Sequence, residues 1–234
     1  KPTTMKFLTT LVVFFLAVIG FSQTDCKPYM PTEEGSTWEH THYSKKDKVT
    51  GRTSFELLKK TENGDSLTFR IKATYFDEKD EEIYVNEFDA YCKGGVFEMD
   101  MSSRLNGETM SAYESMDVTV DATNFPLPTL DEAVGTHLDD GTLNVQVSMN
   151  GMNTFKMVIE VSDRMVAARE NMETKAGTFD CVKISQTVNT KMVVKLQSTT
   201  NEWYAEGVGA VRTESFDKKG RLTGYTVLTA IDAK

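Results

Sequence analysis

Apolar and polar residues alternate with a period of two along most of the chain, and this pattern constrains the fold more than any other feature. Every second side chain is apolar in residues 67–75, and residues 143–149 and 191–196 repeat the rhythm. Successive side chains of a β-strand point to opposite faces of a sheet, so each run predicts a strand with one buried and one wet face. We therefore expect a mainly β protein.

Turn-forming residues separate these runs. Gly and Asn accept positive φ angles, and such residues let neighbouring strands fold back on one another as antiparallel hairpins. The segments concerned are residues 63–65, 77–80, 93–95, 150–151 and 217–220. No run of helical period separates successive strands. The pattern predicts a single antiparallel meander of roughly ten to twelve strands that forms a half-open or closed barrel-like curved sheet.

One long segment does not alternate. From Met99 to Leu138 the pattern is interrupted at residues 106–107, 125–128 and Gly135. We expect a short helical or irregular crossover over about residues 100–138, with a short helix near residues 111–116. It connects two groups of strands and could plug or cover an open barrel end, and loops of this length are often functional.

The N-terminus has the parts of a secretory signal peptide. Lys6 precedes an apolar run over residues 7–21, and Gly20 and Ser22 suit a cut after Ser22, with a cut after Gln23 as the alternative. An uncleaved membrane anchor is disfavoured because no basic stop-transfer cluster follows. Residues 1–4 precede the expected initiator methionine. We assign residues 1–22 to the signal peptide and 23–234 to one antiparallel β domain.

Charge and cysteine content agree with export to the periplasm, the cell envelope or the exterior. Removing residues 1–22 takes away two lysines and no acid, so the net charge goes from −9 to −11. An acidic surface repels phosphate backbones, which excludes nucleic acid as a partner. Cys26, Cys92 and Cys181 allow one disulfide and one free thiol, and spacing leaves the pairing open. Lipidation of Cys26 is disfavoured because the preceding residues lack a small, apolar lead-in.

No catalytic or metal-binding pattern is present. His40 and His42 share a strand face with Trp38, a spacing that suits two imidazoles on one metal, with His137 as a distant third ligand. A partly exposed polar strand face is the favoured interpretation. The sequence contains no GxSxG or HExxH motif. We expect no enzyme activity, no cofactor and no metal.

Methionines and aromatic residues are the candidate binding groups. Flexible thioethers can line an adaptable apolar cavity, although ordinary core filling explains them as well. Two aromatic residues beside the Gly-Val-Gly turn at 207–209 could shape a cavity mouth, and tight packing at a turn is the alternative. The candidate ligand-binding residues are Trp38, Met99, Met149, Met157, Met192, Trp203 and Tyr204.

Four stretches carry a resemblance to a known family: residues 29–35, 176–184, 203–212 and 217–220. Together they resemble the TapB-like proteins of Bacteroidetes, exported proteins related to a domain family of unknown function. The resemblance spans nearly the whole mature chain, and the strand, Gly-Val-Gly turn and strand at 203–212 is its most specific motif. It implies an envelope location and a fold similar to lipoprotein carriers, whose curved antiparallel sheet half-wraps helices or a hydrophobic cavity.

Two functional hypotheses follow. The first is a non-enzymatic envelope protein that binds or carries an apolar or amphipathic molecule, such as a lipid, in the concave face of the sheet. The second is a structural protein that binds another envelope protein through its sheet edges or acidic loops. A cavity with identified lining residues would separate the two.

Overall fold

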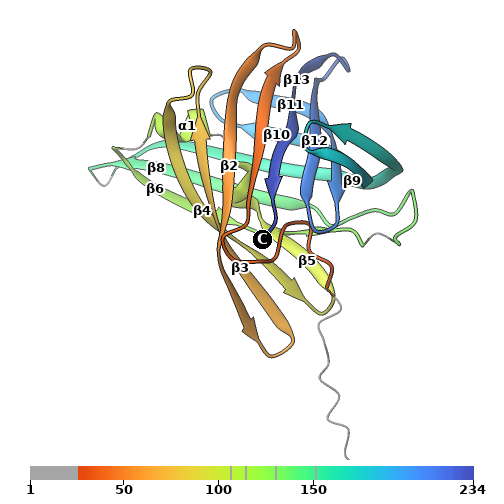
Figure 1. Cartoon of the computed structure of the whole chain (residues 1–234). Coiled ribbons are helices and arrows are strands. Elements are labelled where there is room, and N and C mark those ends of the chain that lie inside the picture. Colours follow the sequence, from red (N-terminus) through yellow and green to blue (C-terminus); the bar gives the residue numbers. More distant parts are fainter. Residues whose placement is uncertain (1–25, 106, 114, 130, 151) are drawn as a thin grey trace, which may run out of the picture.

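A computed structural model of the chain describes residues 26–105, 107–113, 115–129, 131–150 and 152–234. Thirteen antiparallel strands form one sheet that curls into a nearly closed barrel, as Figure 1 shows. This confirms the predicted fold class. The expected signal peptide at residues 1–22 lies outside the described residues. Neither helix among the described residues has the length and hydropathy to span a bilayer.

The strands follow one another in the sheet as β6-β8-β9-β10-β11-β12-β13-β1-β2-β3-β4-β5-β7, with β6 and β7 at the two edges. Their bounds are β1 Thr37–Ser44, β2 Val49–Asn63, β3 Ser66–Phe76, β4 Glu82–Lys93, β5 Val96–Asp100, β6 Asp117–Ala122, β7 Asn124–Leu127, β8 Gly141–Met149, β9 Met152–Thr174, β10 Gly177–Lys191, β11 Lys195–Ala205, β12 Gly209–Asp217 and β13 Leu222–Asp232. The short helices are η1 Met101–Arg104 and α1 Gly107–Ser111.

The period of two produces the strands as expected. In β8, Leu143, Val145 and Val147 are buried while the residues between them are partly exposed. The predicted run at 67–75 lies within β3. The run at 191–196 is different, because the chain reverses between β10 and β11 at residues 192–194. The prediction of a single strand over these residues is wrong. The alternation is present in the sequence, but Lys191 pairs with Lys195 across a hairpin.

The crossover is more ordered than predicted. It supplies both edge strands, since β6 pairs with β8 and β7 pairs with β5. Its α-helix ends at Ser111, where the sequence suggested that a helix begins, so that prediction is wrong. Asp100 caps η1 by accepting a hydrogen bond from the Ser102 amide at 2.7 Å. The crossover thereby places Met101, Leu105 and Phe125 in the core.

The main core lies on the concave side of the sheet, and a small cluster lies on the convex side. Core residues such as Phe69 and Ile71 from β3 and Val145 from β8 have almost no exposed surface. The convex cluster contains Cys181, Trp203, Ala205 and Val211. Trp203 belongs to that face because its neighbours in β11 point inward. The sheet therefore has one large interior and one local outer packing site.

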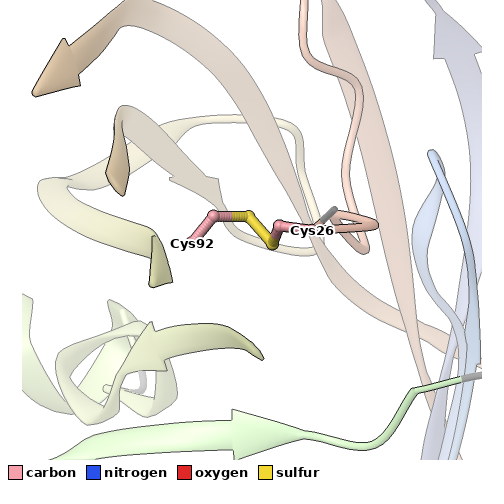
Figure 2. The surroundings of a disulfide bond; sticks show 2 residues. All are labelled: Cys26 and Cys92. Atoms are coloured by element: carbon pink, nitrogen blue, oxygen red, sulfur yellow. A yellow bond between two sulfur atoms is a disulfide. The ribbon is translucent and has the colours of Figure 1, made fainter. Parts of the chain in front are cut away.

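A disulfide joins Cys26 to Cys92, with 5.8 Å between their Cα atoms (Figure 2). It ties the segment before β1 to the end of β4, which resolves the pairing that the sequence left open. Cys181 is free and buried, and burial raises the pKa of its thiol to about 12. The thiol of Cys26 is consumed by the disulfide, so in this form it cannot carry a lipid.

Candidate functional site

A cavity of about 160 Å³ opens on the concave side of the sheet. Its lining comes from the segment before β1, from strands β1 to β5, from η1, and from β11 and β12. The lining residues are Tyr29, Met30, Trp38, His40, Phe55, Ile71, Phe88, Phe97, Met99, Ser103, Arg104, Glu202, Tyr204, Gly209, Ala210 and Thr213. One part of this wall is aromatic and another part is polar.

Aromatic rings form most of the apolar wall. Trp38 stacks on Phe55 with 5.3 Å between ring centroids and 8° between ring planes. Tyr29 meets Tyr204 edge-on at 5.9 Å and lies 6.3 Å from Phe97. These rings reach one another because β1, β2 and β11 present alternate side chains to the same interior. The result is a rigid surface suited to apolar groups.

The segment before β1 closes one side of the cavity. The Tyr29 hydroxyl donates to the Pro128 carbonyl at 2.6 Å, and the Gly207 amide donates to the Pro28 carbonyl at 2.8 Å. Gly209 has φ +111°, and a Cβ there would lie 3.2 Å from the Tyr29 carbonyl oxygen. Glycine is therefore needed both for its backbone angle and for this close approach. The Gly-Val-Gly turn holds the N-terminal segment against β11 and β12.

An ion pair between a partly exposed arginine and a buried carboxylate forms the polar end of the cavity. The guanidinium of Arg104, on η1, contacts both carboxylate oxygens of Glu202, and its Nη2 donates to Oε2 at 2.8 Å. The same carboxylate accepts hydrogen bonds from the Tyr204 hydroxyl at 2.7 Å and from the Gln186 amide at 2.8 Å. All acceptor positions of a carboxylate with 1% exposure are thus in use.

A second arginine, Arg164, lies behind this pair and is fully buried. Arg164 donates from Nη2 to the Pro126 carbonyl at 2.7 Å and from Nε to Gln186 at 3.3 Å. The ring of Phe125 lies between the two guanidinium groups, 4.7 Å from that of Arg104 and 3.5 Å from that of Arg164. Arg164 therefore approaches Glu202 through Gln186 rather than by a direct ion pair, and the charges of Glu202 and Asp140 both act on it.

The pKa shifts follow from this arrangement. Burial by itself raises the pKa of Glu202, but the charge and hydrogen bonds of Arg104, the hydrogen bond from Tyr204 and the charge of Arg164 together outweigh burial, and the pKa is lowered. Burial by itself lowers the pKa of Arg104, and Glu202 reverses the shift so that the pKa is raised. Burial and the neighbouring Arg104 charge lower the pKa of Arg164 to about 10. All three groups are therefore charged at neutral pH.

The two strand histidines are held by hydrogen bonds. Nε2 of His40 donates to the Ala210 carbonyl at 2.8 Å, and the nitrogens of His42 lie 2.8 Å and 2.9 Å from the hydroxyls of Thr53 and Thr226. Burial, helped by the charge of His42, lowers the pKa of His40 to about 4. Burial also lowers the pKa of His42. Among the described residues, no three potential metal ligands come together.

The structure brings together three of the seven candidate binding residues. Trp38, Met99 and Tyr204 line the cavity. Met157 is buried in the main core outside the lining, and Trp203 lies in the convex cluster, where its indole N–H donates to Glu170 at 2.6 Å. The remaining two, Met149 and Met192, are 48% and 37% exposed at hairpin tips.

Sequence reasoning missed the polar end altogether. Arg104 lies in the crossover, where apolar and polar residues do not alternate, so the neighbouring sequence gave no sign that its side chain enters the interior. Glu202 carried a weak signal, because it shares the inward face of β11 with the buried Tyr204. A carboxylate on the apolar face of a strand indicates a buried partner. That partner is 98 residues away in the chain.

A second, more polar hollow lies between β4, η1 and β6. Its volume is about 470 Å³. Its wall contains the carboxylates of Glu87, Asp100 and Asp121 together with small and aliphatic side chains. It has one aromatic residue, Tyr84, and its lining includes no arginine or lysine. The aromatic cavity is therefore the better candidate for an apolar ligand.

Fold and cavity together define an antiparallel, nearly closed barrel with a small mixed aromatic and polar interior site. The family model described as DUF3108-like matches residues 33–228, and the chain belongs to this family. A comparison with curated proteins finds no match.

Two solved structures share the fold. One, from Bacteroides fragilis NCTC 9343, is described as an exported protein with a YmcC-like fold; it is 25% identical, with a TM-score of 0.79 over 88% of this chain and 100% of its own. The other, from Parabacteroides distasonis ATCC 8503, is described as a lipoprotein; it is 23% identical, with a TM-score of 0.79 over 88% of this chain and 99% of its own. Neither description states a ligand or a reaction.

Proposed function

We propose that this protein is exported to the cell envelope and binds a small apolar or amphipathic molecule in the aromatic cavity, without catalysing a reaction. The observation that carries the proposal is the cavity itself, a hollow walled by stacked rings inside a curved sheet. Export is supported by the N-terminal apolar run, by the disulfide, and by the compartment described for the Bacteroides relative. We also propose, as a closer relationship than membership of the DUF3108-like family, that the chain is one of the TapB-like proteins.

The size of the cavity limits the ligand. A cavity of about 160 Å³ is close to the ~150 Å³ that accommodates a benzene ring in an engineered protein core. It can hold one ring or a short acyl segment, and a longer molecule would extend out of it. Phe55, Met99 and Thr213 line the cavity and keep part of their surface accessible, which suits a ligand that enters from solvent.

The polar end favours a particular kind of ligand. Arg104 lines the cavity, and its side chain remains 22% exposed although its guanidinium pairs with Glu202. An anionic head group, such as a carboxylate, would accept hydrogen bonds from the exposed part of the Arg104 guanidinium, while its apolar part contacts Trp38 and Phe55. The favoured ligand is therefore a small anionic amphiphile, and Trp38, Met99 and Tyr204 are its proposed contacts.

Native mass spectrometry of protein purified from its own envelope tests the proposal. The wild type should carry a bound small molecule. Ala210→Phe, which places a ring in the cavity, should reduce the bound fraction at least about tenfold. Ala230→Phe, on the exposed part of β13, is the matched control and should leave it unchanged. A wild type without ligand, or an Ala210→Phe variant that retains it, would contradict the proposal.

Protein binding at the sheet edges is the alternative function. Strands β6 and β7 end the sheet, and among the described residues each has a strand neighbour on one side only. Such edges can accept a strand from another protein. Recovery of one stoichiometric envelope protein, with no small molecule in the mass spectrum, would favour this alternative.

A further inference from the structure

Three hairpins at one end of the barrel carry a concentration of positive charge. They are the turns β1–β2 (residues 44–49), β12–β13 (217–221) and β10–β11 (191–195). The register places the first two side by side, because Ser44 is opposite Gly224, and it puts the third at the same end of the sheet, because Ser198 is opposite Asp217. The first two stand at the top of Figure 1. We call these three turns the basic rim.

The charge of the basic rim is opposite to that of the whole chain. Its residues include eight lysines or arginines and two acids, whereas the chain has a net charge of −9. Asp217 pairs with Arg221, Lys48 with Glu78 and Lys191 with Glu160. The other five basic side chains have no acidic partner within 4 Å among the described residues: Lys45, Lys46, Lys195, Lys218 and Lys219. This charge is free to meet an anionic partner.

An exposed apolar tip projects from the same rim. Between Lys191 and Lys195 the chain reads Met-Val-Val, and Val193 is 95% exposed and Val194 60% exposed. Leu196, just beyond, is 56% exposed. Isolated exposed apolar residues are common, but a contiguous group between two lysines at the end of a hairpin is unusual for a surface in contact with water alone.

We propose that the basic rim docks on an anionic lipid bilayer, with the 192–194 tip inserted at the interface. Apolar side chains that enter the acyl boundary, beside lysines at head-group level, are the arrangement that an interfacial anchor requires. The lysines in the β1–β2 and β12–β13 turns are at the same end of the sheet and add to the positive charge that attracts the bilayer. An acidic protein partner would pair with the lysines of the basic rim, but unlike a bilayer it would leave the apolar tip in water. This inference is independent of the cavity and its ligand.

The number of lysines and exposed valines in the rim sets the expected loss of membrane affinity in each variant. Each lysine near an anionic surface contributes about a fivefold gain in affinity. Loss of Lys218 and Lys219 should therefore weaken binding about 25-fold, and raising the salt concentration should weaken it as well. Replacing the two exposed valines by serine removes the inserted part and should weaken binding at least about tenfold. The acidic β3–β4 turn next to the rim limits the contact to the three basic turns.

Vesicle co-sedimentation tests the proposal. The wild type should sediment with vesicles of equal parts phosphatidylglycerol and phosphatidylcholine, and about tenfold less with pure phosphatidylcholine. The variants are Val193→Ser with Val194→Ser, and Lys218→Gln with Lys219→Gln. Val134→Ser, at a valine about as exposed as Val194 in another part of the chain, and Lys175→Gln, at the β9–β10 turn, are the matched controls. All proteins must share one N-terminus, since the apolar run at 7–21 would itself bind lipid.

The outcomes separate the alternatives. Loss of sedimentation in the rim variants but not in the controls, with unchanged circular dichroism, supports docking. Wild-type protein that stays in solution with anionic vesicles overturns it. So does sedimentation that the two valine substitutions do not change, since binding would then be purely electrostatic or would involve another surface.

Discussion

The interior of the barrel is filled in two different ways. On one side, strands β1 to β5 contribute rings and aliphatic side chains such as Phe55, Leu57 and Phe69. On the other, β9 to β11 and η1 contribute Arg164, Glu202 and Arg104, joined by hydrogen bonds and by the ring of Phe125. Apolar packing loses stability in proportion to the volume removed, whereas an ionic cluster depends on every partner. The candidate cavity lies where the two kinds of interior meet.

The ionic side should be the more sensitive to a single change. Glu202→Gln keeps the shape of the side chain but removes the buried negative charge that pairs with Arg104 and also acts on Arg164. We expect a loss of about 4 kcal/mol in the free energy of unfolding. Urea denaturation measures it. Glu206→Gln, at an exposed carboxylate in the next turn, is the control and should change stability by less than about 0.5 kcal/mol.

The apolar side should respond to lost volume. Leu57→Ala empties a fully buried position in β2 and should cost about 3 kcal/mol. Leu58→Ala, the next residue, is the control: its side chain is 37% exposed, and the expected loss is below about 1 kcal/mol. If Leu57→Ala destabilised the protein more than Glu202→Gln, the contrast between the two sides would fail.

The boundary between the sides should be sensitive to pH. His40 lines the cavity with a pKa of about 4, below its usual ~6.5, so the unfolded chain takes up a proton that the folded chain does not. Stability should therefore fall as the pH drops from about 6.5 to 4, by about 2 kcal/mol for this partly exposed ring.

Unfolding free energies between pH 7 and 4 test this, with His40→Gln as the comparison. The variant should show a flatter profile in that window. Asp217, whose pKa is lowered to about 2 chiefly by its hydrogen bond to Arg221, acts only at lower pH and does not interfere. Identical profiles for the two proteins would exclude His40 as the cause.

Local pattern predicted the architecture well. The alternation in β3 and β8 indicated both the strands and their buried faces, and the hairpins fall at turn residues such as those at 63–65 and 217–220. It failed at 191–196, because the alternating pattern does not reveal a chain reversal that lacks Gly or Asn. Among the binding candidates, Trp38 and Tyr204 lie on the inward faces of β1 and β11. Trp203 precedes Tyr204 in β11, so the alternation of side chains turns it to the outward face.

The order of oily and polar residues along the chain determined the strands, the faces they bury and the antiparallel meander, because these depend on neighbours one or two positions away. Only the tertiary structure decided that Cys26 bonds to Cys92 and that Arg104 meets Glu202. Those pairs are 66 and 98 residues apart. Their contact depends on how the whole sheet curls and how the crossover enters it, and no local pattern contains that information.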